Sequence, residues 1–127
     1  MPLVRLSLPQ STTNADVTAV SNAVHTALVA TFNVPEPDRF HAVHRHQPHE
    51  LVCTPEFFGI AHSLHVVFVQ ISCSSGRSLE LKKALYANIA GGIAATSTFR
   101  SEDVIINLLE TSRDNWSFGL GIAQYAT

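Results

Sequence analysis

A strand–helix–strand pattern occurs twice along this chain, and it limits the possible folds more than any other feature. In the first half, residues 3–8 alternate apolar and polar side chains, which is typical of a half-buried strand. The Thr-x-x-Asp spacing at 13–16 predicts a helix start, and apolar side chains at helical spacing continue over 17–32. Pro35 ends this helix, and residues 40–46 are a second candidate strand.

The second half of the chain repeats this order after a looser stretch. Residues 47–63 contain two prolines and a glycine, and they predict an excursion with a short hairpin. The run HVVFVQISC at 65–73 is the strongest strand signal, because such dense β-branched residues suit a buried central strand. Ser78 predicts a helix N-cap before apolar helical spacing over 81–93, and residues 104–109 are the last candidate strand.

Two right-handed βαβ units can share one four-stranded sheet with both helices on the same face. The sequence therefore predicts a single α+β domain that spans residues 1–127. The opposite face of the sheet would be bare, and we expect it to be apolar. Hydrophobic residues make up 46% of the chain and charged residues only 14%, which favours cover by neighbouring subunits. The pattern predicts an oligomer but does not give the number of subunits.

Composition excludes several classes of function. The formal net charge is -2 and no basic run occurs, so we expect no nucleic-acid partner. No apolar stretch reaches membrane-spanning length and no signal segment is evident, so we expect no membrane association. Cys53 and Cys73 lack metal-ligand spacing and fit a reducing compartment as small buried hydrophobes. These features predict a soluble cytoplasmic protein.

Pro2, directly after the start methionine, has two interpretations. Its position can be chance. Removal of Met1 would instead leave a secondary amine held in the proline ring. An α-amino group titrates near about 7.7–8.0, and burial or a neighbouring cation lowers that pKa. Such an amine can act as a general acid or base, or attack a carbonyl to form an iminium adduct.

Five further side chains have a structural interpretation, and Arg77 has a chemical one as well. Arg77 is either a solvated loop residue or a guanidinium that grips a carboxylate through two parallel hydrogen bonds. Asp38 follows two prolines and precedes a strand, which suits a turn residue that bonds local backbone N–H groups. The aromatic residues of the tail most often indicate core or interface packing, and these are Trp116, Phe118 and Tyr125.

The seven histidines raise the question of a metal site. His44 and His46 share one strand face, with His41 and His49 nearby. No cysteine or carboxylate has matching ligand spacing. We therefore expect no metal site and interpret the histidines as solvent-facing or interface residues.

Several segments resemble one known family over essentially the whole chain. The start Met-Pro-Leu-Val-Arg-Leu resembles the tautomerase superfamily, whose members use an amino-terminal proline. Four further segments resemble the malonate semialdehyde decarboxylase branch: residues 32–40, with Val-Pro-x-x-Asp-Arg-Phe; 76–78; 114–119, with Asp-x-Trp-Ser-Phe-Gly; and 121–125.

This resemblance implies a homotrimer of double βαβ subunits with active sites between subunits and no cofactor. It gives Pro2 the catalytic role, lets Asp38 position or activate water, and lets Arg77 bind the substrate carboxylate. Arg77 is the one arginine in its turn, where the best-known decarboxylases carry two. The resemblance also implies an apolar wall around the proline, formed by Trp116, Phe118 and Tyr125.

The expected substrate is a small oxo acid, and three functions stay open. The first is decarboxylation like that of malonate semialdehyde decarboxylase, with hydration by an Asp38-bound water as a side activity. The second is keto–enol tautomerisation of a 2-oxo acid such as phenylpyruvate. The third is a non-catalytic trimeric binding module in which Met1 is retained, because the Pro2 nitrogen is then an amide without basicity.

Overall fold

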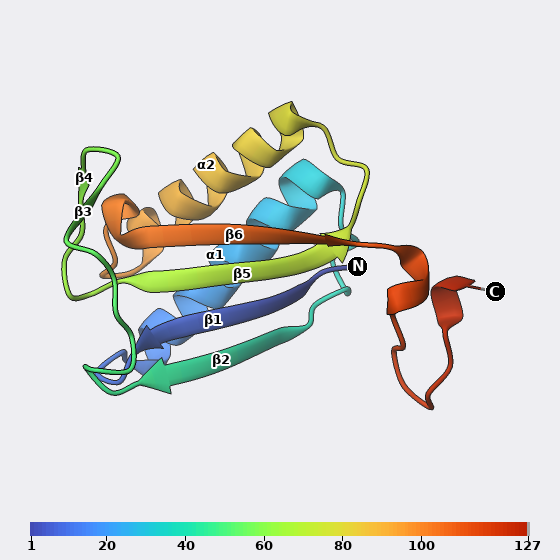
Figure 1. Ribbon diagram of the computed structural model, residues 1–127, viewed down its shortest axis with the longest axis horizontal. Helices are drawn as coiled ribbons and strands as arrows, with labels where there is room; N and C mark the ends of the chain where they lie inside the picture. Colours follow the sequence, from blue (N-terminus) through green and yellow to red (C-terminus); the bar gives the residue numbers. More distant parts are fainter. Residues whose placement is uncertain (127) are drawn as a thin grey trace.

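The body of the protein is a four-stranded sheet with two helices on one face (Figure 1). The computed structural model describes residues 1–126. The main elements are, in chain order, β1 (Leu3–Pro9), α1 (Asn14–Phe32), β2 (His41–His46), β5 (Val67–Ser74), α2 (Leu79–Thr96) and β6 (Val104–Thr111). The strand order is β2-β1-β5-β6, with β1 parallel to β2, β5 parallel to β6, and β1 antiparallel to β5. The two predicted βαβ units and the α+β fold are confirmed.

Both helices begin at the residues that the sequence predicts. The side chain of Thr13 accepts a hydrogen bond from the backbone N–H of Asp16 at the start of α1. Ser78 does the same for Leu81 at the start of α2. Each bond satisfies one of the N–H groups that a helix leaves free in its first turn. These caps fix where each crossover leaves the sheet.

The core lies between the helices and the sheet. It is formed by side chains that point inward from the two central strands and from both helices; those fully excluded from solvent include Val4, Leu8, Val20, Val24, Leu28, Val67, Ile71, Leu85, Ile89 and Ile93. The strands bury alternate residues, as their sequence pattern predicts. This packing fixes the register of the sheet, because a one-residue slip would expose the buried set.

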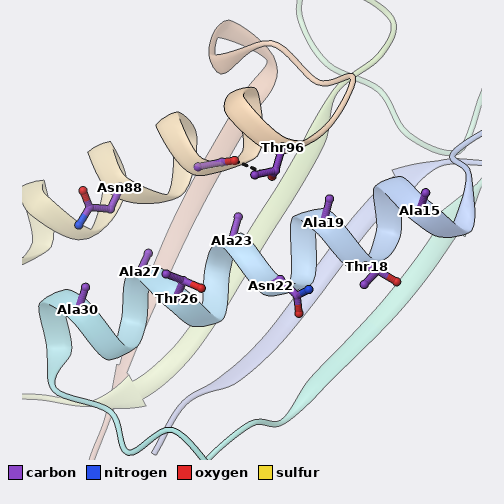
Figure 2. A pocket seen from close by; sticks show the side chains of 11 residues that line it. Ala15, Thr18, Ala19, Asn22, Ala23, Thr26, Ala27, Ala30, Asn88 and Thr96 are labelled. Carbon is purple, nitrogen blue, oxygen red and sulfur yellow. Dashed lines mark hydrogen bonds between the residues drawn. The ribbon is translucent and has the colours of Figure 1, made fainter.

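Small residues let the two helices approach closely. A Cβ added at Gly92 would lie 3.3 Å from the Cβ of Ala23, so the helix contact uses the missing side chain. Figure 2 shows the side chains of Ala19, Ala23 and Ala27 pointing from α1 toward α2. Gly91 and Gly92 lie inside α2 and do not end it, because the helix continues to Thr96.

The face of the sheet opposite the helices is bare, but it is not apolar as the sequence analysis expected. Because Val4, Leu6 and Leu8 point into the core, Leu3 and Arg5 point to the other face. Polar residues continue across it, and the Gln70 side-chain amide bonds that of Asn107 at 3.3 Å. A mixed surface of this kind suits a polar contact or solvent as well as an apolar neighbour.

The excursion between the two halves holds the predicted hairpin, formed by β3 (Glu56–Phe57) and β4 (Ile60–Ala61). Beyond β6, the tail continues past the sheet edge that carries the amino terminus, and it contains two 3₁₀ turns, Arg113–Asn115 and Gln124–Ala126 (Figure 1). Over residues 1–126, neither helix is long and apolar enough to cross a membrane.

Candidate active site

Strand directions bring the predicted catalytic segments to one edge of the sheet. The start of β1 lies beside the start of β2, because these strands are parallel, and beside the end of β5, which is antiparallel. Pro2 precedes β1, Asp38 precedes β2, and Arg77 follows β5. The amino terminus lies at this edge in Figure 1. Three segments that are distant in sequence therefore meet around the amino terminus.

The amino group at this edge has a lowered pKa. In the full chain it belongs to Met1, and burial lowers its pKa from 8.0, with the Arg77 cation as the second cause. The carboxylate of Asp38, and Cys73 in its thiolate form, oppose this shift. Pro2 itself is buried. A basic group placed here is thus in its neutral form at lower pH than an ordinary terminus, with a cation and a carboxylate close enough to act on it.

Arg77 is held by the backbone rather than by a carboxylate. Its Nη1 donates to the carbonyl oxygen of Ser74 at 3.0 Å, and its Nη2 donates to that of Phe32 at 3.3 Å. The guanidinium also lies 4.8 Å from the centre of the Phe32 ring. Gly76, with a φ of 122°, turns the chain just before it. Two of the five N–H donors are used, so three are left without partners among residues 1–126. The fixed guanidinium can bind an incoming carboxylate.

Asp38 lies in a tight turn and is half-buried. Its backbone N–H donates to the carbonyl oxygen of Pro35 at 2.9 Å. Among residues 1–126, its carboxylate forms neither a hydrogen bond nor an ion pair, so the turn-capping interpretation is wrong. Arg39 does not neutralise it, because the guanidinium bonds Asn22 on α1 instead. The Asp38 carboxylate is therefore free to act on the amino terminus or on water.

An aromatic hollow lies beside these groups. It has a volume of about 520 Å³ and is lined by Leu3, Phe40, Ser72, Thr111, Asn115, Trp116, Ser117 and Phe118. The Trp116 indole is fixed by a 2.7 Å hydrogen bond to Thr111 and stacks on Phe118. Tyr125 packs edge-on against Phe118 and does not line the hollow. Leu3 connects the hollow to Pro2, whereas Arg77 and Asp38 are not on its wall.

The comparisons with known proteins agree with this arrangement. Two family models described as tautomerase enzymes match residues 38–119 and residues 2–60. The chain belongs to the tautomerase family. Among its relatives, the probable tautomerase YusQ of Bacillus subtilis (strain 168) is 30% identical over 124 residues, which is 98% of both chains. The probable tautomerase YrdN of the same strain is 28% identical over 127 residues, covering 100% of this chain and 98% of YrdN.

Two of the solved structures that are similar to this chain are of enzymes with the same activity. FG41 malonate semialdehyde decarboxylase, inhibited by 3-bromopropiolate, has a TM-score of 0.91 and 31% identity, covering 98% of this chain and 94% of its own. A second malonate semialdehyde decarboxylase has a TM-score of 0.89 and 33% identity, covering 98% and 95%. A fused 4-OT trimer, at 21% identity and a TM-score of 0.78 over 98% of both chains, shares the fold. The resemblance to the malonate semialdehyde decarboxylase branch is confirmed.

The sequence analysis of this tautomerase missed two kinds of site residue. Phe40 and Thr111 line the hollow, yet neither was a candidate. Their position relative to the strands could have indicated them, because Phe40 immediately precedes β2 and Thr111 ends β6 at the same edge of the sheet. Cys73 was interpreted as a buried hydrophobe, and it is buried. Burial raises the pKa of the Cys73 thiol.

The histidines of the tautomerase do not all face solvent or an interface, as the sequence analysis expected. His44 and His46 stack with ring centres 4.3 Å apart, which confirms their shared face. His25 is instead buried within the chain, with 3% of its surface exposed. Across residues 1–126, no cluster of three or more metal-ligating side chains occurs.

His41 makes the stability of this tautomerase pH-dependent. Burial, followed by Arg39 and His25, lowers its pKa from 6.5 to about 4. The unfolded chain therefore binds a proton between those pH values that the folded chain does not, and the free energy of unfolding falls as pH decreases through this window. A pKa shift of this size corresponds to about 3 kcal/mol in the free energy of unfolding, and the partial exposure of His41 reduces this to roughly 1–2 kcal/mol.

The matched variant is His41→Asn, because its side-chain amide can donate or accept the 2.8 Å hydrogen bond that links His41 to Ser21. Urea unfolding should show that the free energy of unfolding falls less between pH 7 and pH 4.5 in this variant than in the unmodified chain. Equal losses would contradict the shifted pKa of His41.

Proposed function

We propose that this tautomerase acts on a small oxo acid through the amine of Pro2, which removal of Met1 makes the amino terminus. Decarboxylation of malonate semialdehyde is the reaction that we favour. The observation that carries the proposal is the meeting of the amino terminus, Asp38 and Arg77 at one sheet edge. The similarity to two malonate semialdehyde decarboxylases over 98% of the chain supports the choice of reaction.

In the proposed decarboxylation, Arg77 binds the carboxylate through the donors that the backbone leaves free. The cationic amine of Pro2 polarises the aldehyde oxygen while the bond between C2 and the carboxylate breaks. Carbon dioxide leaves, the electron pair of the broken bond forms an enolate, and C2 then takes a proton from water to give acetaldehyde. The aromatic hollow adjoins Pro2 through Leu3 and gives the amine an apolar wall on that side. Asp38 orients a water molecule for hydration, and one neighbouring structure concerns both decarboxylase and hydratase activities.

Keto–enol tautomerisation is the second candidate, and the lowered pKa of the terminal amine favours it. A neutral Pro2 nitrogen would take a proton from one atom of a 2-oxo acid such as phenylpyruvate and return it to another. The pH profile separates the two reactions. An acid role loses activity as pH rises through the amine pKa, whereas a base role loses activity as pH falls through it. A non-catalytic binding module with Met1 retained is the remaining alternative.

We also propose a homotrimer with the active sites between subunits. The bare sheet face and the exposed apolar side chains of the tail support an assembly, since Leu120 is 94% exposed and Ile122 is 49% exposed. A similar fold occurs in a symmetric trimer of fused 4-OT. Sedimentation equilibrium should give three times the mass of 13.8 kDa. A monomer at micromolar concentration would refute the trimer.

The test of function is a proton NMR time course of malonate semialdehyde with protein whose intact mass confirms the loss of Met1. We expect acetaldehyde to appear faster than in buffer. Enol phenylpyruvate, followed by its ultraviolet absorbance, is the parallel substrate. Acetaldehyde would support decarboxylation, enol decay alone would support tautomerisation, and neither signal would favour the binding module.

A further inference from the structure

A buried histidine fastens the loop that carries Asp38. His25 lies on α1 with 3% of its surface exposed, and its Nε2 is 2.8 Å from the backbone carbonyl oxygen of Glu36. A carbonyl only accepts hydrogen bonds, so Nε2 carries the hydrogen. The other ring nitrogen, Nδ1, is buried and has no partner among residues 1–126. An unsatisfied ring nitrogen costs free energy in a core, and the bond to the Glu36 carbonyl is the one hydrogen bond of this ring among residues 1–126.

The carbonyl that His25 holds lies at the centre of the Asp38 turn. The turn runs from Pro35 to Asp38, closed by the 2.9 Å hydrogen bond between them, so the peptide after Glu36 is its central one. Pro37 at the third position suits neither common turn. It disfavours the αR conformation that type I needs at Glu36, and its ring forbids the positive φ of type II. The local sequence therefore leaves the orientation of this peptide to tertiary contacts.

The other side of Asp38 is fastened to the same helix. The Arg39 guanidinium donates to the Oγ of Ser21 at 2.8 Å and to the Oδ1 of Asn22 at 2.6 Å. His41, the next titratable group, bonds Ser21 as well. Asp38 thus lies between two chain segments that are each bonded to α1. Arg39 is exposed, whereas the His25 anchor is buried, so His25 is the firmer of the two.

We propose that His25 is a positioning residue that sets the Asp38 carboxylate beside the amino terminus by holding the Glu36 carbonyl. The role rests on the proposed function of that site. His25 contacts no reacting atom and acts only through the turn. The titratable and charged groups near it on the helix and loop are the Arg39 guanidinium, His41 and the exposed Glu36 carboxylate, which lies 3.7 Å away.

The test compares two substitutions that differ in one donor. His25→Gln places an amide N–H near the position of Nε2, whereas His25→Leu fills similar space without any donor. We expect His25→Leu to lower kcat for hydration or decarboxylation about tenfold or more, with KM little changed because Arg77 is untouched. His25→Gln should restore most of the loss. In the Asp38→Asn background, His25→Leu should have little further effect, because both act through one carboxylate.

A second readout does not need activity. The Asp38 carboxylate raises the pKa of the terminal amine, so both Asp38→Asn and His25→Leu should lower that pKa in an NMR titration of the ¹⁵N-labelled amino terminus. If the unmodified protein is inactive, the proposed function fails while this titration still tests the positioning role. His65→Leu is the control, since the His65 ring bonds Thr98 and stacks on Phe99, away from the site.

Three outcomes would overturn the positioning role. These are equal losses in His25→Gln and His25→Leu, a full additional loss in the Asp38→Asn background, and an unchanged amine pKa in His25→Leu. If His25→Leu does not fold, as judged by thermal melting, His25→Met supplies the donor-free variant with a more adaptable side chain.

Discussion

Replacing Pro2 by alanine should lower kcat/KM for the oxo acid by about a hundredfold or more, which is the usual contribution of a positioned general acid or base. The substitution keeps an amino terminus but removes the ring that fixes the nitrogen at the start of β1. A primary amine on a freely rotating chain loses the alignment with Arg77 and Asp38 that the proposed chemistry needs. Steady-state kinetics measure the loss.

The control for this substitution is Pro9→Ala, at the opposite end of the same strand. It removes a proline ring from β1 without touching the site edge, so kcat/KM should stay within about threefold. Intact mass must show that Met1 is absent from all three proteins. An active Pro2→Ala variant with unchanged kcat/KM would refute a catalytic proline and return attention to the binding module.

The fold was predictable because its signals are local. Thr13 and Ser78 cap the helices through hydrogen bonds to residues three positions away. The β-branched residues of β5 indicate a buried strand without reference to any other part of the chain. The site was predictable in part for a related reason. Pro2, Asp38 and Arg77 each adjoin a strand end, and the strand directions of two βαβ units bring those ends together.

What the sequence could not show depends on contacts across space. The far face was expected to be apolar, yet strand pairing sets Gln70 beside Asn107 there. His25 follows the helical pattern of α1 and gives no sign that its Nε2 reaches the Glu36 carbonyl eleven positions later. No local pattern reports such a bond, because its energy depends on the path of the intervening loop.

Replacing Arg77 by glutamine should raise KM and lower kcat/KM by roughly a hundredfold, because charge-assisted hydrogen bonds contribute about 1.5–3 kcal/mol each. Arg77→Lys should recover little, since an ammonium cannot offer two parallel donors to a carboxylate. Arg77→Gln should also raise the pKa of the terminal amine, because the Arg77 cation lowers it. This direction is opposite to that expected for Asp38→Asn. The two charges can therefore be told apart by NMR titration alone.

Loss of Arg77 also removes its bonds to the Ser74 and Phe32 carbonyls, so a fall of about 1–2 kcal/mol in the free energy of unfolding is expected. Arg45→Gln controls for this cost. Its guanidinium bonds the Thr12 carbonyl and the Asn14 side chain at the other edge of the sheet. If Arg45→Gln loses similar stability but keeps its KM, the KM change in Arg77→Gln reports carboxylate binding. Equal KM changes in both variants would show that Arg77 acts through stability, and the substrate carboxylate would then need another partner.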